Sequence, residues 1–188
     1  MGAVDPVAEA FAATPREDFL PASQRGSAAY DGPLPIGLGQ TSSQPSTVEA
    51  MLRLLDLRAG QKVLDVGCGS GWTTALLARL TGPSGRVLGV ELEPELVEFG
   101  SHNLDRTDLP WASIHQAAAG VLGLPSAAPY HRILVSAMAQ ELPDDPVAQL
   151  HTGGVMVVPV NGTMLRVARS MRGVGITRHG SYRFVPLR

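Results

Sequence analysis

The sequence predicts an α/β fold with a doubly wound, mostly parallel sheet of about seven strands and helices on both faces. Three observations lead to this prediction. The chain has 188 residues, of which 44% are hydrophobic and 17% charged, as expected for one packed globular domain. Between residues 46 and 158, apolar segments of strand length alternate with segments of helical periodicity. Two later strand-like segments have no helical pattern between them, so we expect them to pair antiparallel.

Each element is predicted from a local signal. Asp5 and Pro6 form a typical helix start, an N-cap carboxylate followed by proline, and this helix continues to residue 13. A second helix is expected from Ser46, with Gly60 closing it. Further helices are expected at 73–80 and 94–104, and strands at 63–66, 86–90, 112–116, 133–135, 155–158, 164–168 and 182–185.

The segment from residue 21 to 45 is rich in Gly, Pro, Ser and Gln. A connection of this length inside a compact domain is usually functional or disordered. Its apolar residues Leu34, Ile36 and Leu38 can anchor it to a core, so we expect an ordered loop. We therefore interpret 1–188 as a single domain, in which 1–45 comprises an N-terminal helix and this loop.

Charge and cysteine content narrow the class of protein. The formal net charge is −2 and the sequence pI about 6.2, without the basic excess of proteins that bind nucleic acid or anionic membranes. The single Cys68 excludes an internal disulfide and, without a signal-peptide pattern, fits a reducing compartment. No apolar run approaches the roughly 20 residues that cross a bilayer. We therefore expect a cytoplasmic domain with no nucleic acid and no membrane among its partners.

A glycine-rich turn follows the strand predicted at 63–66. Glycines at 67, 69 and 71 allow a sharp bend from strand to helix and let a ligand approach the bare backbone. A dinucleotide site needs a small residue directly after the third glycine, and Trp72 stands there. The Gly-Lys-Ser/Thr of a phosphate loop is also missing. The turn therefore predicts a ligand other than a dinucleotide or nucleoside triphosphate.

Two acidic residues accompany this turn. Asp65 would repel a pyrophosphate but suits an ammonium group, directly or through water. Glu91 ends the next strand, where an acidic side chain can accept hydrogen bonds from ribose hydroxyls. A nucleoside with a cationic amino-acid tail and no phosphate describes S-adenosylmethionine. The alternative is an ordinary tight turn with solvated acids.

Taken together, residues 7–187 resemble the protein-L-isoaspartate O-methyltransferase family. The most specific matches are Gln-Thr-Ser-Ser-Gln-Pro at 40–45 and Arg-Phe-Val-Pro-Leu at 183–187. Leu-Asp-Val-Gly-Cys-Gly-Ser-Gly at 64–71 is the wider methyltransferase motif, which many activities share. Further matches lie at 10–21, 30–37, 90–96 and 150–154.

The resemblance implies a Rossmann-like fold and S-adenosylmethionine-dependent methylation of the free α-carboxylate of isoaspartyl residues in damaged proteins or peptides, as a repair reaction. The protein would be a monomer, use no metal and place the 1–45 loop on the substrate side. The implied catalytic residue is Ser43, and the implied substrate-binding residues are Gln40, Thr41, Ser42 and Val185. The implied cofactor-binding residues are Asp65, Gly67, Gly69, Gly71, Glu91, Leu92, Ala119 and Gly120.

One departure from the family pattern concerns the cofactor. The family has Gly-Asp-Gly after its third strand, with the Asp on the adenine amino group, whereas this chain has Ala119 in place of the acid. Gln116 is one hypothetical substitute. The N-terminal section is also shorter than is usual for the family. These departures leave two alternatives, a carboxylate O-methyltransferase for a specific peptide aspartate or a catalytically weakened nucleoside-binding domain.

Several other residues are of types that can act in functional sites, but we interpret them as structural. Ser43 would be a helix N-cap if the resemblance were set aside. Cys68 is interpreted as a packing residue, and Trp72 and Phe99 as core or pocket wall. Asp144 and Asp145 precede a proline and are interpreted as helix-capping acids. The five histidines lack metal-ligand spacing.

Overall fold

The structure is a computed structural model and describes residues 5–188. The helices are α1 (Pro6–Ala12), α2 (Pro45–Leu55), α3 (Trp72–Thr81), α4 (Pro94–Asp105) and α5 (Asp144–Gln149), with 3-10 turns η1 (Arg16–Phe19), η2 (Ala22–Ser27) and η3 (Pro125–Ala127). The strands are β1 (Leu34–Gly37), β2 (Gln40–Ser42), β3 (Lys62–Val66), β4 (Arg86–Glu91), β5 (Ala112–Gln116), β6 (Tyr130–Val135), β7 (Leu150–Val160), β8 (Thr163–Ser170) and β9 (Gly173–Ser181).

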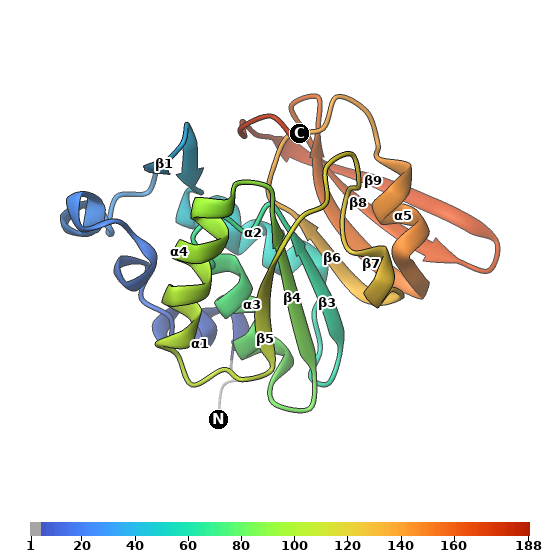
Figure 1. Cartoon of the computed structure of the whole chain (residues 1–188). Coiled ribbons are helices and arrows are strands. Elements are labelled where there is room, and N and C mark those ends of the chain that lie inside the picture. Colours follow the sequence, from blue (N-terminus) through green and yellow to red (C-terminus); the bar gives the residue numbers. More distant parts are fainter. Residues whose placement is uncertain (1–4) are drawn as a thin grey trace.

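The main sheet has seven strands in the order β5-β4-β3-β6-β7-β8-β9 (Figure 1). The strands from β5 to β7 in this order are parallel, and β8 and β9 join them antiparallel. The chain winds from β3 outward to β5 and then returns to the other side of β3 through β6. The predicted fold class is confirmed. The antiparallel partner of β8 is β9, not the segment 182–185 that the sequence predicted.

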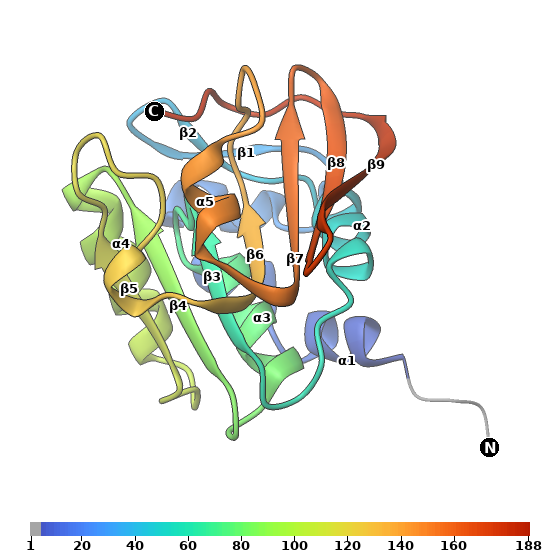
Figure 2. The same ribbon diagram turned by 90° about the vertical axis from the view of Figure 1, so that its right-hand side faces the viewer.

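The helices cover the two faces of the sheet unequally. Among residues 5–188, helices α1 to α4 lie on one face, and α5 and the turn η3 lie on the other (Figure 2). Core residues of β3 alternate between the two layers, with Val63 in one cluster and Leu64 in the other. This double coverage explains why the central strands are almost continuously apolar. Within residues 5–188, no helix has the length and apolar character to cross a membrane.

The second helix ends earlier than predicted. It stops at Leu55, and Asp56 adopts a left-handed φ of 48° instead of continuing toward Gly60. Two arginines from the sheet donate hydrogen bonds to carbonyls at this end. The guanidinium of Arg132 donates to the Asp56 carbonyl at 2.9 and 3.1 Å, and Arg166 donates to the Leu54 carbonyl at 2.9 Å. These donors satisfy carbonyls that the helix itself leaves free.

The strand predicted at 182–185 is wrong, because the last strand is β9 and ends at Ser181. Its glycines at 173, 175 and 180 disfavour a strand locally, but pairing with β8 through a tight hairpin imposes one. The segment 21–45 is ordered as expected. It contains the β1–β2 hairpin, which the sequence interpretation missed.

Candidate functional site

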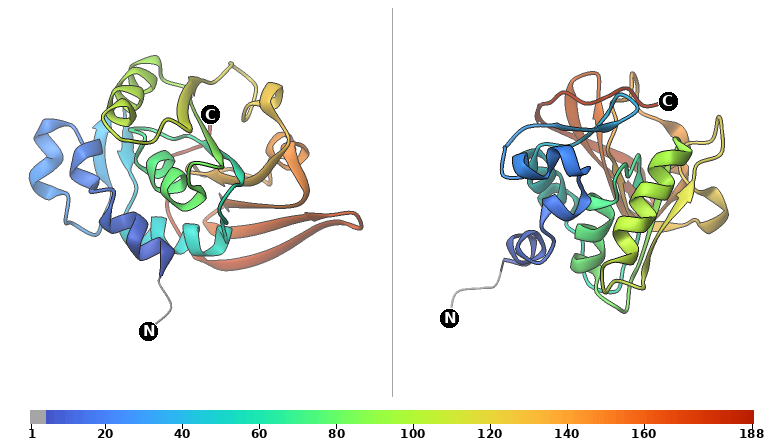
Figure 3. Two further views of the ribbon diagram at one scale, coloured as in Figure 1. Left: turned by 90° about the horizontal axis from the view of Figure 1, so that it is seen from below. Right: turned by 60° about the vertical axis from the view of Figure 1, so that its left-hand side comes forward.

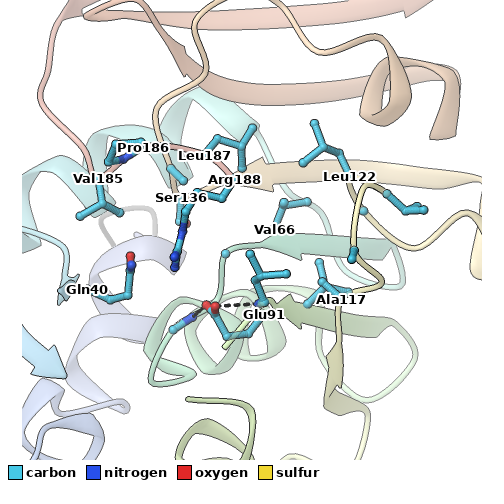
Figure 4. Close-up of a pocket in the computed structure, with 18 of the residues that line it drawn as sticks. Gln40, Val66, Glu91, Ala117, Leu122, Ser136, Val185, Pro186, Leu187 and Arg188 are labelled. Carbon is cyan, nitrogen blue, oxygen red and sulfur yellow. Dashed lines mark hydrogen bonds between the residues drawn. The ribbon is translucent and has the colours of Figure 1, made fainter. Parts of the chain in front are cut away.

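The carboxyl ends of β3, β4 and β6 open onto a cavity. This crevice lies where the strand order reverses, the usual ligand position in open α/β sheets. Glu91 lies on one side of the cavity, and Val185, Pro186 and Leu187 lie opposite it (Figure 4). The loop 117–123 closes one end. We call this space the first cavity.

The glycine turn forms part of its wall. Gly67 and Gly69 line the first cavity with positive φ angles of 74° and 54°. A Cβ on Gly69 would lie 3.0 Å from the terminal methyl of Ile36. Gly71 does not line the cavity, contrary to its predicted role as a ligand contact. A Cβ there would lie 3.0 Å from the Gly100 carbonyl, so Gly71 serves the close packing of α3 on α4.

Glu91 lines the first cavity as predicted and is only 7% exposed. One carboxylate oxygen accepts a hydrogen bond from the Gly69 N–H at 3.0 Å. The other accepts from the N–H groups of Leu92 and Glu93, at 2.7 and 3.1 Å. The side chain therefore ties the glycine turn to the start of α4. A carboxylate has about four acceptor positions, so it retains capacity for a ligand hydroxyl.

Asp65 lies in a different place from the one its predicted role requires. It is fully buried and absent from the cavity wall, and one carboxylate oxygen accepts from the hydroxyls of Thr73 and Thr74 at 2.7 and 2.8 Å. Burial raises the pKa of Asp65 to about 6, the charge of Glu91 adds to this, and the two threonine hydrogen bonds oppose it. Asp65 therefore holds the first turn of α3, and its other oxygen accepts a hydrogen bond at 3.5 Å from the hydroxyl of Ser136, which lines the first cavity.

Asp65→Asn is expected to become progressively more stable than the wild type between pH 4 and 7. In the folded protein, the pKa of Asp65 lies above its ordinary value of 3.8. The protonated carboxyl therefore stabilises the fold of the wild type at low pH, and this contribution is lost as the pH rises through about 6. Asparagine keeps a carbonyl for Thr73 and Thr74 but does not titrate. The gain in unfolding free energy should reach about 3 kcal/mol, measured by urea unfolding at each pH. A pH-independent difference would contradict this.

The end of the first cavity at 117–123 is apolar. Leu92, Ala119 and Gly120 line the first cavity, as predicted. Gln116 does not substitute for an acid at position 119. Its side-chain amide donates to the carbonyls of Leu92 and Glu91, and the residue is not part of the cavity wall. This end of the cavity therefore offers backbone groups and small side chains.

A second cavity adjoins the first. Thr41, Ser136 and Val185 line both cavities, so the two share a wall. The second cavity is lined by Pro33, Thr41, Ser43, Gln44, Ser46, Thr47, Ser136, Ser181, Tyr182, Arg183, Phe184 and Val185. Among these, Arg183 is the one charged side chain and there is no acidic one. Hydroxyls and a guanidinium suit an anionic ligand such as a carboxylate.

The predicted catalytic residue Ser43 and the predicted substrate-binding residues of the loop 40–45 lie in different places. Ser43 lines the second cavity, and Gln40 lines the first (Figure 4). Ser42 is buried, and its hydroxyl accepts a hydrogen bond from Arg16 at 3.1 Å. The capping interpretation of Ser43 is wrong, because Gln44 is the N-cap of α2. Within residues 5–188, the Ser43 hydroxyl has no hydrogen-bond partner, which leaves it available to a ligand.

Sequence interpretation missed Arg16 as a site residue. Its side chain is buried beneath the loop, and its two terminal nitrogens donate to the carbonyls of Tyr30, Gly32, Ser42 and Ser43, each at 2.9 Å. Burial lowers the pKa of the guanidinium. The sequence shows only that a basic residue lies in the N-terminal segment. It does not show the partners of Arg16, because these are backbone carbonyls 14 to 27 positions away.

The remaining candidates have structural roles. Cys68 is buried, and burial raises the pKa of its thiol well above the usual value, consistent with packing. Trp72 belongs to the core, and Phe99 packs against a smaller apolar cluster. Asp144 and Asp145 lie in the first turn of α5, but no side chain of residues 5–188 caps that helix, so the capping interpretation is wrong. In the part of the chain that the structure describes, no three His, Cys, Asp or Glu side chains gather as a metal site.

A family model for protein-L-isoaspartate(D-aspartate) O-methyltransferase matches residues 1–188. The chain belongs to this family. A protein-L-isoaspartate O-methyltransferase from Methanopyrus kandleri is 44% identical over 186 residues, which cover 96% of this chain and 82% of the relative. One from Aeropyrum pernix is 49% identical over 161 residues, which cover 86% of this chain and 62% of the relative.

Solved structures agree in fold. One described as protein-L-isoaspartate O-methyltransferase has a TM-score of 0.89 and 26% identity, and the match covers 98% of this chain and 62% of that one. A putative family member from Plasmodium falciparum, solved with S-adenosyl-L-homocysteine, has a TM-score of 0.86 at 23% identity, covering 100% of this chain and 92% of its own. The chain thus spans about three fifths of the length of some relatives and most of the length of others.

Proposed function

We propose that this chain uses S-adenosylmethionine to methylate the free α-carboxylate of isoaspartyl residues in proteins or peptides. The observation that supports this most is the wall that the two cavities share, formed by Thr41, Ser136 and Val185. One cavity suits a nucleoside and the other a carboxylate, so a methyl donor and its acceptor would meet at that wall. Membership of the family points to the same reaction.

The residues of the first cavity fit the cofactor. Gly67 and Gly69 leave bare backbone where a side chain would intrude, and Glu91 supplies an acceptor for ribose hydroxyls. The other charged lining residue, Arg188, is paired with Glu93 at 2.6 Å, so it does not oppose a cationic ligand. Bound there, S-adenosylmethionine would supply an electrophilic methyl group on a positively charged sulfur.

The chain's own residues would act mainly by orientation. An α-carboxyl has a pKa near 3.5, so the acceptor is already an anion at neutral pH and needs no general base. Thr41, Ser43 and Arg183 present donors that would hold the carboxylate. Restraining the two reactants at close range, with water excluded by the apolar side chains of Phe184 and Val185, would provide most of the acceleration.

Further parts of the proposal concern the whole chain. We propose that 1–188 acts as one methyltransferase domain with 1–45 on the substrate side, although residues 1–4 lie outside the described part. Gln40 joins the cofactor-contacting residues, and Ser42 serves to position the loop. The proposed protein is a cytoplasmic monomer without a nucleic-acid partner.

A methyl-transfer assay tests the central proposal. Radiolabelled S-adenosylmethionine is supplied with a synthetic isoaspartyl peptide or with its normal aspartyl twin. Label is expected in the isoaspartyl peptide alone. Label in the aspartyl twin alone would favour the carboxylate methyltransferase of different specificity, and label in neither would refute the repair activity. Calorimetry with S-adenosylhomocysteine would then separate a nucleoside-binding domain from a protein that binds no nucleoside.

Ser43→Ala is expected to lower turnover of the isoaspartyl peptide by about 10- to 100-fold, because a hydrogen bond to a charged group contributes about 1.5–3 kcal/mol. The dissociation constant of S-adenosylmethionine should stay within about twofold, since Ser43 does not line the first cavity. Ser84→Ala, which lies outside both cavity walls, is the control and should retain full turnover. Equal turnover in the two variants would assign Ser43 no role in the reaction.

Ala119→Asp is expected to tighten cofactor binding about 3- to 10-fold, the effect of about 0.5–1.5 kcal/mol for one regained hydrogen bond. Ala119 is exposed at the cavity wall, so the larger side chain displaces nothing. Ala118→Asp places the same charge one position away and controls for charge attraction. Calorimetry with S-adenosylhomocysteine, which lacks the sulfonium charge, should show the gain for position 119 only. An equal gain in both variants would exclude a base contact.

A further inference from the structure

The C-terminal part of the chain is strongly basic. Residues 146–188 contain six arginines and no Asp or Glu, although the whole chain has a net charge of −2. Most of this charge is carried by the β8–β9 hairpin, which extends outward from the body of the molecule (Figure 3). A protein of acidic pI therefore presents one local basic arm.

Some of these arginines have internal partners and others do not. Arg166 donates to the Leu54 carbonyl, and Arg169 donates to carbonyls at the end of α5 and the start of β7. The side chains of Arg172, Arg178 and Arg183 have no hydrogen bond or ion pair to any residue within 5–188. They are exposed at the hairpin tip, on β9 and in the wall of the second cavity, respectively. Free positive charge thus extends from the tip to the second cavity.

Strand β9 is also an open sheet edge. It is last in the strand order, and β8 is its one neighbour in the sheet that residues 5–188 form. Its register with β8 is uninterrupted from Gly173 to Arg178, and it contains no proline. Val174 and Ile176 are 46% and 48% exposed. Native proteins usually protect such edges, and an unprotected one can accept an added strand.

The edge leads directly to the second cavity. Ser181, the last residue of β9, lines that cavity together with the following residues up to Val185. At about 3.3 Å per residue, β9 extends roughly 30 Å away from the cavity. A polypeptide paired with this edge would therefore reach the second cavity in an extended conformation.

We propose that the outer edge of β9 binds the acidic polypeptide segment that flanks the methylated residue, as an added strand beside Arg172 and Arg178. This inference rests on the proposed function and specifies its substrate class. Charge complementarity favours an acidic chain over a second copy, since paired β9 strands would bring two arginine-rich hairpins together. The exposed side chains of β9 include no Phe, Tyr or Trp for base stacking, which disfavours single-stranded nucleic acid.

The test measures methylation of four isoaspartyl peptides by the full chain. One is short and neutral, two carry an acidic nine-residue extension on one side or the other, and one carries a neutral extension. We expect an acidic extension on one side only to lower KM about tenfold at low salt, because an added strand has a direction. N-methylation of alternate extension residues should abolish the gain, since it removes the backbone donors of a strand.

The matched variant is Arg172→Gln/Arg178→Gln, which spares both cavities. It should lose the tenfold gain and keep the kcat/KM of the short neutral peptide. Persistence of the gain in this variant, the absence of any gain in the wild type, or its survival after N-methylation would overturn the proposal. Two further results would overturn the proposal. One is dimerisation of the wild type in the ultracentrifuge that the variant abolishes. The other is displacement of the acidic peptide by polyuridylate at a lower concentration than an acidic competitor peptide needs. If the short peptide itself is not methylated, the proposed function fails independently.

Discussion

Gly69→Val is expected to weaken S-adenosylmethionine binding at least 100-fold in calorimetry, about 2.7 kcal/mol or more. Gly69 lines the first cavity with a φ of 54°, which a β-branched residue adopts only with strain. Its Cβ would meet Ile36 at 3.0 Å, and the two methyl groups would occupy space next to the cavity. The variant also threatens the hydrogen bond from the Gly69 N–H to Glu91. The loss in free energy of S-adenosylmethionine binding should therefore exceed the loss in free energy of unfolding.

Gly82→Val separates the ligand effect from backbone strain. Gly82 has a φ of 67° at the end of α3, and a Cβ there would have nothing within 4 Å. Both variants incur backbone strain at positive φ, and Gly82→Val incurs more of it, because its ψ of 179° lies in a region that essentially glycine alone adopts. Only Gly69→Val should lose cofactor binding. Normal binding by Gly69→Val, or equal loss in both variants, would remove the glycine turn from the proposed cofactor site.

The order and type of the central elements could be predicted from sequence because local signals and tertiary packing agree there. The strand predicted at 63–66 differs from β3 by one residue, and the strand predicted at 86–90 differs from β4 by one residue. Double coverage makes such strands apolar on both faces, which is visible in the sequence. Strand β9 has no such signal, because it is exposed and contains three glycines. Only its pairing with β8 makes it a strand.

Site residues could be predicted to the level of the element but not of the side-chain direction. Glu91 and Asp65 both belong to strands that lead to the first cavity, yet only Glu91 lines it. The Asp65 carboxylate points instead to the first turn of α3, where Thr73 and Thr74 meet it. Successive strand residues face opposite sides, so the ligand-facing side depends on the packing of the next helix. No residue pattern within the strand records that packing.

Arg16→Met is expected to lower the unfolding free energy by about 3 kcal/mol or more and peptide turnover by more than tenfold. The substitution keeps an apolar stem above Trp72, whose ring centre lies 5.4 Å from the guanidinium carbon. It removes the donors to four backbone carbonyls in the loop, and each unsatisfied buried carbonyl costs about 1–3 kcal/mol. Without these bonds the Ser43 hydroxyl is no longer held at the second cavity.

Cofactor affinity should fall much less than turnover, because within residues 5–188 Arg16 has no hydrogen bond to Glu91 or to the glycine turn. Arg16→Lys should recover part of the stability, since an ammonium can serve some of the carbonyls but lacks the planar fork of the guanidinium. Arg53→Met is the matched control. Arg53 pairs with Asp5 and Glu49 on the exposed side of α2, where ion pairs contribute little to stability. The unfolding midpoint and the turnover of Arg53→Met should therefore stay near those of the wild type. If Arg16→Met binds S-adenosylmethionine poorly but methylates the peptide at the normal maximal rate, Arg16 supports the first cavity and not the acceptor loop.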